Sequence, residues 1–262
     1  MHGPSLYVVG FLAALVISMV ASPAGVSGAV LLLPFQVSVL GTPSPAVTPT
    51  NLLYNVVATP GALYRYWRQG QTGGSLTALL LAGTVPGVVA GSVLRVEFLP
   101  GPGTFEVVIA VVLVPLGSWL VAGERLQEDA LWMALTTPVL VGLAAIVGVV
   151  GGIYGIGGGS ILAPLLIGAG RSPRQVAPAT LASTFVTSVV GVGTFIVLSV
   201  SRHGSVAPSW GIGVALGLGG LLGGYIGALA QTHLPDKAIR RALGVLVVGI
   251  GARYAYLAAK SN

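Results

Sequence analysis

The chain has 262 residues, of which 54% are apolar and only 7% are charged, against about 25% charged residues in an ordinary soluble domain. This composition leaves too little polar surface for a soluble globular protein, whereas a lipid bilayer accepts it readily. The net charge of +6 comes from basic residues that stand singly or in pairs between apolar runs, so they resemble the loop charges of a membrane protein and not a nucleic-acid surface.

Several apolar stretches are long enough to cross a membrane as helices, for which about 20 residues are needed. In chain order they are 6–21, 47–66, 75–94, 105–121, 131–153, 176–199, 209–230 and 239–259. No Lys or Arg precedes the first stretch, which favours a permanent helix over a signal peptide. We therefore predict an all-α polytopic membrane protein, with residues 1–262 forming a single membrane domain in the cell membrane.

Two further apolar stretches, 26–40 and 156–169, are too short for an ordinary span. Each is entered through glycine residues, and each contains a proline, Pro34 or Pro164, that we expect to break it. The sequence therefore predicts a broken, glycine-rich segment in each half of the chain.

The order of glycines and prolines recurs at an offset near 130 residues. The string Gly25-Val-Ser-Gly-Ala-Val-Leu-Leu-Leu-Pro34 falls on Gly155-Ile-Gly-Gly-Gly-Ser-Ile-Leu-Ala-Pro164, and Val47-Thr-Pro-Thr-Asn-Leu52 falls on Val176-Ala-Pro-Ala-Thr-Leu181. This pattern predicts two homologous halves, 1–123 and 131–262, joined by the charged linker 124–130.

The basic residues indicate how the two halves are oriented. If each short stretch crosses, a half has five segments and the halves are inverted; if each turns back, a half has four crossings and the halves are parallel. The five-segment count places eight of the 12 basic residues on one side, and the four-segment count divides them six and six. The positive-inside rule thus favours inverted repeats of about five segments, with Arg95 among the loop charges of the other side. The eight are Arg65, Arg68, Arg125, Arg171, Arg174, Lys237, Arg240 and Arg241.

The glycine-rich breaks are the candidate substrate site. Irregular backbone at membrane depth must be buried in protein or line a wet cavity, and N–H groups at the start of a following short helix attract an anion without a basic side chain. The alternative, which we prefer for Gly87, Gly91, Gly220 and Gly224, is that glycines only allow close helix packing. The candidate residues at the breaks are Gly25, Ser27 and Gly28 in the first half and Gly157, Gly158, Gly159 and Ser160 in the second.

The stretch that follows each break carries a polar pair at a spacing of four, which places both members on one helical face. The pairs are Asn51 and Asn55 in the first half and Thr180 and Thr184 at the matched positions of the second. Hydrogen bonds to neighbouring helices would satisfy these groups without any substrate. Because both pairs lie just past a break, we expect them to line a shared central site. Weaker members of this set are Thr48, Thr50, Ser183 and Thr187.

The residue types that are missing restrict the mechanism. All six acidic residues lie in predicted loops or near span ends, which disfavours a cation pump. The chain has no cysteine, its three histidines lack metal-site spacing, and it has no nucleotide-binding string. We therefore predict no enzymatic activity, metal or cofactor. The expected partners are a small anion and the bilayer, without nucleic acid, and a homo-oligomer is compatible with the sequence.

The string Gly152-Ile-Tyr-Gly-Ile-Gly-Gly-Gly-Ser-Ile-Leu-Ala-Pro164, followed by Ser172-Pro-Arg-Gln-Val-Ala-Pro-Ala-Thr180, resembles the TauE/SafE family of sulfite exporters and related anion permeases. The resemblance covers essentially the whole chain and implies a secondary transporter of small sulfur-containing or organic anions. The first half departs from the pattern, because Ala24-Gly-Val-Ser-Gly-Ala29 has fewer glycines than its counterpart. A channel-like anion conduit and a non-transporting membrane scaffold are the alternative functions.

Overall fold

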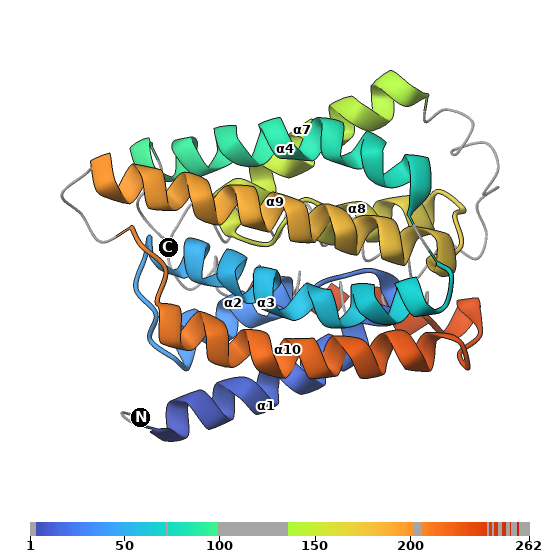
Figure 1. The fold of residues 1–262 in the computed structure, drawn as a ribbon, viewed down its shortest axis with the longest axis horizontal. Helices are drawn as coiled ribbons and strands as arrows, with labels where there is room; N and C mark the ends of the chain where they lie inside the picture. The colour runs from blue at the N-terminus through green and yellow to red at the C-terminus, as the bar shows by residue number, and fades with distance from the viewer. Residues whose placement is uncertain are drawn as a thin grey trace.

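The computed structural model describes residues 4–71, 73–98, 136–201 and 206–239, together with single positions between 241 and 256. This part of the chain is built of helices, with no strand among the described residues (Figure 1). The predicted segment 105–121, the linker 124–130 and most of 239–259 lie outside it. The elements are α1 (Pro4–Ala21), the 3-10 turn η1 (Ser22–Ala24), α2 (Ala29–Ser38), α3 (Val47–Arg68), α4 (Gly74–Glu97), α7 (Thr137–Tyr154), α8 (Gly159–Gly168), α9 (Pro173–Ser201) and α10 (Trp210–Gln231).

Among the described residues, five helices are long and apolar enough to cross a membrane: α1 with η1, α4, α7, α9 and α10. Helix α3 has a comparable length of 22 residues but carries a row of buried polar side chains, including Asn51 and Asn55. The prediction of an all-α polytopic membrane protein is confirmed, and the chain is a multi-pass membrane protein.

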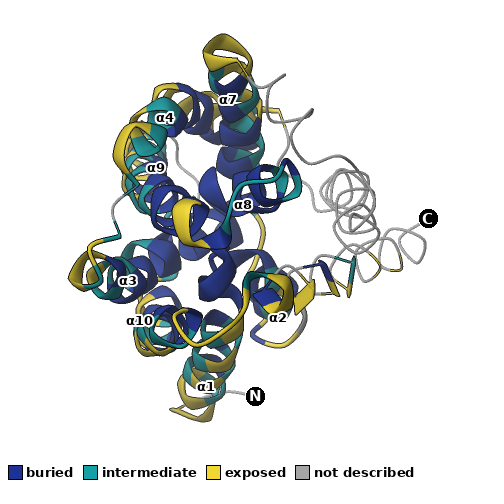
Figure 2. Cartoon of the chain, turned by 90° about the vertical axis from the view of Figure 1, so that its right-hand side faces the viewer, coloured by how far each residue is buried: buried dark blue, intermediate teal, exposed yellow. Residues whose placement is uncertain are grey.

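The helices form two groups that meet at the centre of the molecule. Helices α1, α2, α3 and α10 lie in one group, and α4, α7, α8 and α9 lie in the other (Figure 2). Helix α10 packs along α1 and α3, and helix α4 packs along α7 and α9, while the contact between α3 and α9 joins the groups. Each group therefore includes one helix, α4 or α10, from the opposite half of the chain.

Helices α4 and α10 approach their partners closely because glycine recurs every four residues along one face of each. On α4, a Cβ added at Gly83, Gly87 or Gly91 would collide with the carbonyl oxygen of Val141, Ala145 or Val149 of α7, respectively. On α10, a Cβ added at Gly219, Gly223 or Gly227 would collide with the carbonyl oxygen of Phe11, Leu15 or Met19 of α1. The residue numbers rise together in both pairs, so each pair is parallel. The close-packing interpretation is confirmed for Gly87 and Gly91.

We expect Gly223→Ala to destabilise the protein by about 1–3 kcal/mol, because the new methyl group would push α10 away from the Leu15 carbonyl of α1. Gly193→Ala is the matched control, because Gly193 also lies inside a helix but has no atom within 4 Å of its added Cβ. That control should gain up to about 1 kcal/mol from better helix propensity. Thermal unfolding of the purified variants in detergent measures both effects, and equal shifts in Tm would contradict the packing argument.

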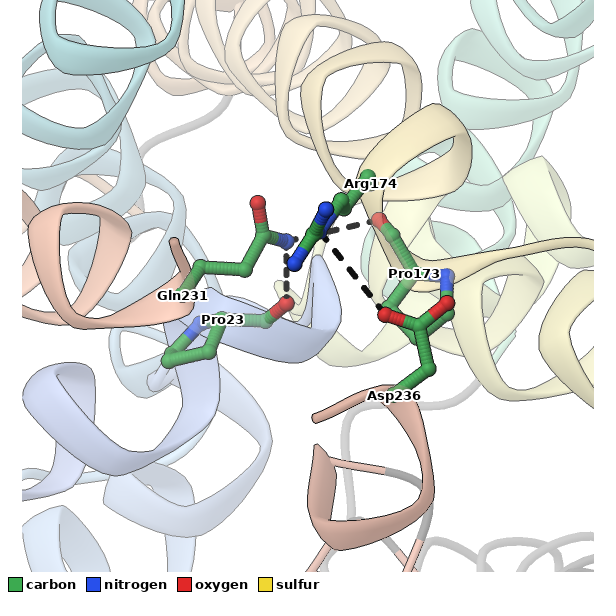
Figure 3. A network of polar contacts seen from close by, with 5 residues as sticks. All are labelled: Pro23, Pro173, Arg174, Gln231 and Asp236. Carbon is green, nitrogen blue, oxygen red and sulfur yellow. Dashed lines mark hydrogen bonds and ion pairs between the residues drawn. The ribbon is translucent and has the colours of Figure 1, made fainter. Parts of the chain in front are cut away.

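At one end of the molecule lie several basic residues and the polar contacts that join the two groups of helices. The Gln231 side-chain amide at the end of α10 donates to the carbonyl oxygens of Pro23 in η1, at 2.6 Å, and of Pro173 at the start of α9, at 3.4 Å (Figure 3). The Arg174 guanidinium lies 3.8 Å from the Asp236 carboxylate. At the end of α3, Gln69 donates to the Ala228 carbonyl of α10 at 3.4 Å. The basic residues that the charge count grouped together include five that lie at this end: Arg65, Arg68, Arg171, Arg174 and Lys237.

The opposite end contains a buried cation. The prediction that Arg95 is a loop charge is wrong, because its side chain is 2% exposed at the last turn of α4. Its guanidinium donates to the Ser44 hydroxyl at 2.6 Å and to the Thr48 hydroxyl at 3.3 Å. Thr48 in turn donates to the Ile153 carbonyl of α7 at 3.2 Å. Arg95 thus joins the ends of α4 and α7 to the start of α3.

The two glycine-rich breaks are irregular, as predicted. Helix α1 and η1 end at Gly25, whose φ is 74°, and α7 ends at Gly155, whose φ is 72°. These left-handed conformations favour glycine and stop the helices. The prolines, however, do not break the short segments: Pro34 and Pro164 lie inside α2 and α8, which continue for several residues beyond them.

Candidate functional site

The two breaks touch each other although they are more than a hundred residues apart in sequence. The Ser27 and Ser160 hydroxyl oxygens lie 2.9 Å apart, and both side chains are buried. The Ser160 hydroxyl donates to the Ile156 carbonyl at 2.8 Å, so the proton between the two serines comes from Ser27. The structure thus brings Ser27 of the first break and Ser160 of the second into contact.

Each break also packs against a long helix of the opposite half. At Gly25, an added Cβ would come within 2.6 Å of the Ala177 Cα of α9, and at Gly155 it would collide with the Thr48 carbonyl of α3. Thr180 of α9 donates to the Gly25 carbonyl at 2.9 Å. Glycine is favoured at both positions for two reasons: φ is positive, and the neighbouring backbone leaves no room for a side chain.

Asn51 and Thr180, the first members of the two polar pairs, hold the first break in place. The Asn51 amide donates to the Ala29 carbonyl at 2.9 Å, and its oxygen accepts from the Gln36 amide at 2.8 Å. The Thr180 hydroxyl contacts the Gly25 carbonyl as described above. These two candidate residues are thus hydrogen-bonded within the protein.

The second members, Asn55 and Thr184, differ from the first. Both are fully buried, yet neither polar atom of the Asn55 amide nor the Thr184 hydroxyl has a hydrogen-bond partner among the described residues. The Ser188 hydroxyl, one turn beyond Thr184, is also buried without a hydrogen-bond partner among the described residues. Buried polar groups are normally paired, so an unpaired group calls for an explanation such as an absent water or ion.

These unpaired groups lie in the same stretch of the antiparallel α3–α9 pair. On α3, Asn55 follows Leu52, which packs near Gly191 of α9, and precedes Ala62, which clusters with Leu181 of α9. Spacings of three and seven residues put Asn55 on the face that carries these two contacts. On α9, Thr184 and Ser188 follow Leu181 by three and seven residues, so they lie on the face of α9 that contacts α3.

The second break packs directly on this stretch. A Cβ added at Gly157, whose φ is 69°, would lie 2.6 Å from the Thr184 methyl group and 3.2 Å from the Ser188 hydroxyl. One added at Gly159 would lie 2.6 Å from the Thr184 hydroxyl. The glycines therefore let the backbone approach the unpaired hydroxyl groups closely.

The amides at the starts of α2 and α8 are not all bare, contrary to the sequence-based expectation. The Tyr54 hydroxyl lies against the Gly28 backbone, 2.5 Å from an added Cβ, and the Gly158 N–H donates to the Thr187 hydroxyl at 3.3 Å. The Ser27 hydroxyl accepts from the Ala29 N–H at 3.3 Å. In this conformation, side-chain oxygens occupy positions at which an anion's oxygens could accept the same hydrogen bonds.

A small cavity lies beside the first break. Its volume is about 10 Å³, close to the minimum for one water molecule. Hydroxyl groups dominate the polar part of its wall, and no ionised side chain lines it. Its lining residues are Ser18, Ser22, Ser27, Gly28, Tyr54, Ala58, Thr59, Ala62, Leu181 and Gly220.

Sequence reasoning missed several residues of this region. Ser188 continues the predicted polar face of α9 by one more turn, so its spacing from Thr184 could have identified it. The hydroxyl oxygen of Thr84, in the apolar helix α4, lies 3.0 Å from the Ser183 hydroxyl. Tyr54 and Gln36 gave no signal, because their roles depend on contacts with other helices.

The chain matches the family model described as "Sulfite exporter TauE/SafE" over residues 10–254. It is 25% identical over 239 residues to a "Probable membrane transporter protein" of Xylella fastidiosa (strain Temecula1 / ATCC 700964), covering 86% of each chain. It is 27% identical over 194 residues to the "Probable membrane transporter protein YunE" of Bacillus subtilis (strain 168), covering 68% of each chain. No solved structure gives a significant match.

Proposed function

Because the chain belongs to the TauE/SafE family of sulfite exporters, we propose that it is a secondary transporter of small sulfur-containing or organic anions, such as sulfite or sulfonates. The observation that carries this proposal is the buried contact between Ser27 and Ser160, which brings the two breaks together. In this proposal the protein is not an enzyme, and it acts in the cell membrane with the anion and the bilayer as its partners.

The proposed binding site lies where the breaks meet the α3–α9 pair. Helix-start N–H groups and the hydroxyl and amide groups of both halves hold the anion, without a buried basic side chain. A neutral site of this kind suits a transporter, because hydrogen bonds of dipoles release an anion more readily than a desolvated ion pair does. The proposed contacts are Gly25, Ser27, Gly28, Asn51, Asn55, Gly157, Gly158, Gly159, Ser160, Thr180 and Thr184. Asn55 and Thr184 are the side chains with unpaired polar atoms, so they are the first candidates for direct contact with the anion.

We further propose that the two halves are inverted repeats that move by alternating access. Helices α1, α3 and α10 run in one direction and α4, α7 and α9 in the other, as their contacts indicate. Helices at matched positions of the two halves are thus antiparallel, which inverted repeats require. The cavity beside the first break, at about 10 Å³, is too small for sulfite, so in this proposal the helices rearrange before an anion binds.

Flux measurements in proteoliposomes test the proposed function. Purified protein should take up labelled sulfite along its gradient with saturation kinetics, and unlabelled sulfonates should compete. Empty liposomes and liposomes with heat-denatured protein are the controls.

Other outcomes would point to the alternative functions. Large single-channel currents in planar bilayers would replace alternating access with a channel. Neither flux nor binding of sulfite, sulfonates or carboxylates by well-folded protein would contradict transport and favour a scaffold.

A further inference from the structure

The Tyr54 phenol lies beside the first break and lines the small cavity together with Ser27 and Gly28. Its side chain is 1% exposed, and its hydroxyl group lies 2.6 Å from the Ser18 hydroxyl of α1. The same oxygen also lies against the backbone of Gly28 at the start of α2. A Cβ at Gly28 would lie 2.5 Å from the phenol oxygen, so glycine is what allows this approach.

The second break is closed in a different way. The matched amide, that of Gly158, donates to the hydroxyl of Thr187, a much smaller side chain. The residue matched to Tyr54 by the sequence offset is Ser183, which instead pairs with Thr84. The first break therefore carries a bulky aromatic ring where the second has short hydroxyl side chains.

Resting on the proposed function, we propose that Tyr54 determines which anions enter the site. Its hydroxyl oxygen, which lies against the backbone of Gly28, holds the place that an oxygen of the anion takes during transport, and its ring sets the size of the space beside it. An entering anion displaces the phenol from Gly28 and Ser18, and the ring excludes anions with bulky substituents.

The proposal makes Tyr54 both a competitor for the Gly28 amide and a steric filter. Tyr54→Phe removes the competing oxygen but keeps the ring, so binding of a small anion should tighten. Tyr54→Ser removes the ring and introduces the residue found at the matched position, so bulky anions should enter. Ser18→Ala keeps the phenol but removes its hydrogen bond to α1, so the anion should displace it more easily.

The test compares these variants by uptake of labelled sulfite and benzenesulfonate into proteoliposomes, with KM and kcat determined separately. We expect the KM for sulfite to fall about fivefold in Tyr54→Phe and about twofold in Ser18→Ala, with a smaller change in kcat. Benzenesulfonate uptake relative to sulfite uptake should rise at least tenfold in Tyr54→Ser. Tyr66→Phe is the matched control, because this buried tyrosine of the same helix donates to the Ser22 carbonyl at 2.9 Å and should change neither quantity.

Wild-type values for sulfite KM and for anion size preference in the three variants would overturn the role of Tyr54 while leaving the proposed function intact. If the Tyr54 variants do not fold, Ser18→Ala decides, because an unchanged KM there contradicts the proposal. Failure of the wild-type protein to move any anion would instead overturn the proposed function, and the role of Tyr54 with it.

Discussion

Asn55→Leu is expected to lower sulfite flux at least tenfold while leaving the protein as stable as the wild type or more stable. The Asn55 amide is fully buried and has no hydrogen-bond partner among the described residues, so its burial costs about 1–3 kcal/mol that a leucine of similar size avoids. Loss of flux with no loss of stability is the result expected for a side chain retained for its contact with substrate. Proteoliposome flux and thermal unfolding in detergent measure the two quantities.

Asn51→Leu is the matched control, one helical turn earlier on α3. Its amide makes two buried hydrogen bonds, to Ala29 and from Gln36, so the substitution should destabilise the protein by about 2–4 kcal/mol. If Asn55→Leu keeps wild-type flux, Asn55 does not contact the anion. If it destabilises the protein as much as Asn51→Leu does, its amide is paired and the argument from its burial is wrong.

Gly155→Ala should destabilise the protein by about 2–5 kcal/mol, enough to remove much of the folded protein from membranes. A side chain in the left-handed conformation at a φ of 72° costs about 1–2 kcal/mol. The methyl group would also collide with the Thr48 carbonyl of α3, which adds an overpacking cost of about 1–3 kcal/mol. The yield of folded protein and its Tm are the measurements.

Gly70→Ala separates the two contributions. Gly70 also has a φ of 72°, but no atom lies within 4 Å of an added Cβ, so its substitution carries only the conformational cost. Its Tm should therefore fall much less than that of Gly155→Ala. Equal losses would show that the contact between the second break and α3 contributes little to stability.

The helical segments were predictable because their apolar length is a local property. The stretches 6–21, 75–94 and 209–230 correspond to α1, α4 and α10 within a few residues at each end. The breaks were also predictable, because the glycines at Gly25 and Gly155 come directly before an apolar stretch that is too short for an ordinary span. The prediction that Pro34 and Pro164 break the two short segments was wrong. A proline removes one backbone hydrogen bond but does not necessarily end a helix that packs against its neighbours.

The partners of the polar groups were not predictable. Spacing put Asn51 and Asn55 on one face, but only the tertiary structure shows that Asn51 is paired with α2 and Asn55 is unpaired. Arg95 looked like a loop charge because it lies near the end of its span, and its burial follows from the packing of α4 against α7 and from its own contact with the start of α3. The hydroxyl groups that lie against the Gly28 backbone and accept from the Gly158 amide come from α3 and α9, so local sequence patterns could not identify them.

Anomalous diffraction from crystals soaked in selenite, the selenium analogue of sulfite, tests the central claim most directly. The soak should use a concentration at which selenite competes with labelled sulfite for transport. The account predicts a selenium peak between the two breaks, within hydrogen-bond distance of Ser27 or Ser160 and of Asn55. A peak confined to the basic end, near Arg171 and Arg174, with no density between the breaks, would contradict it.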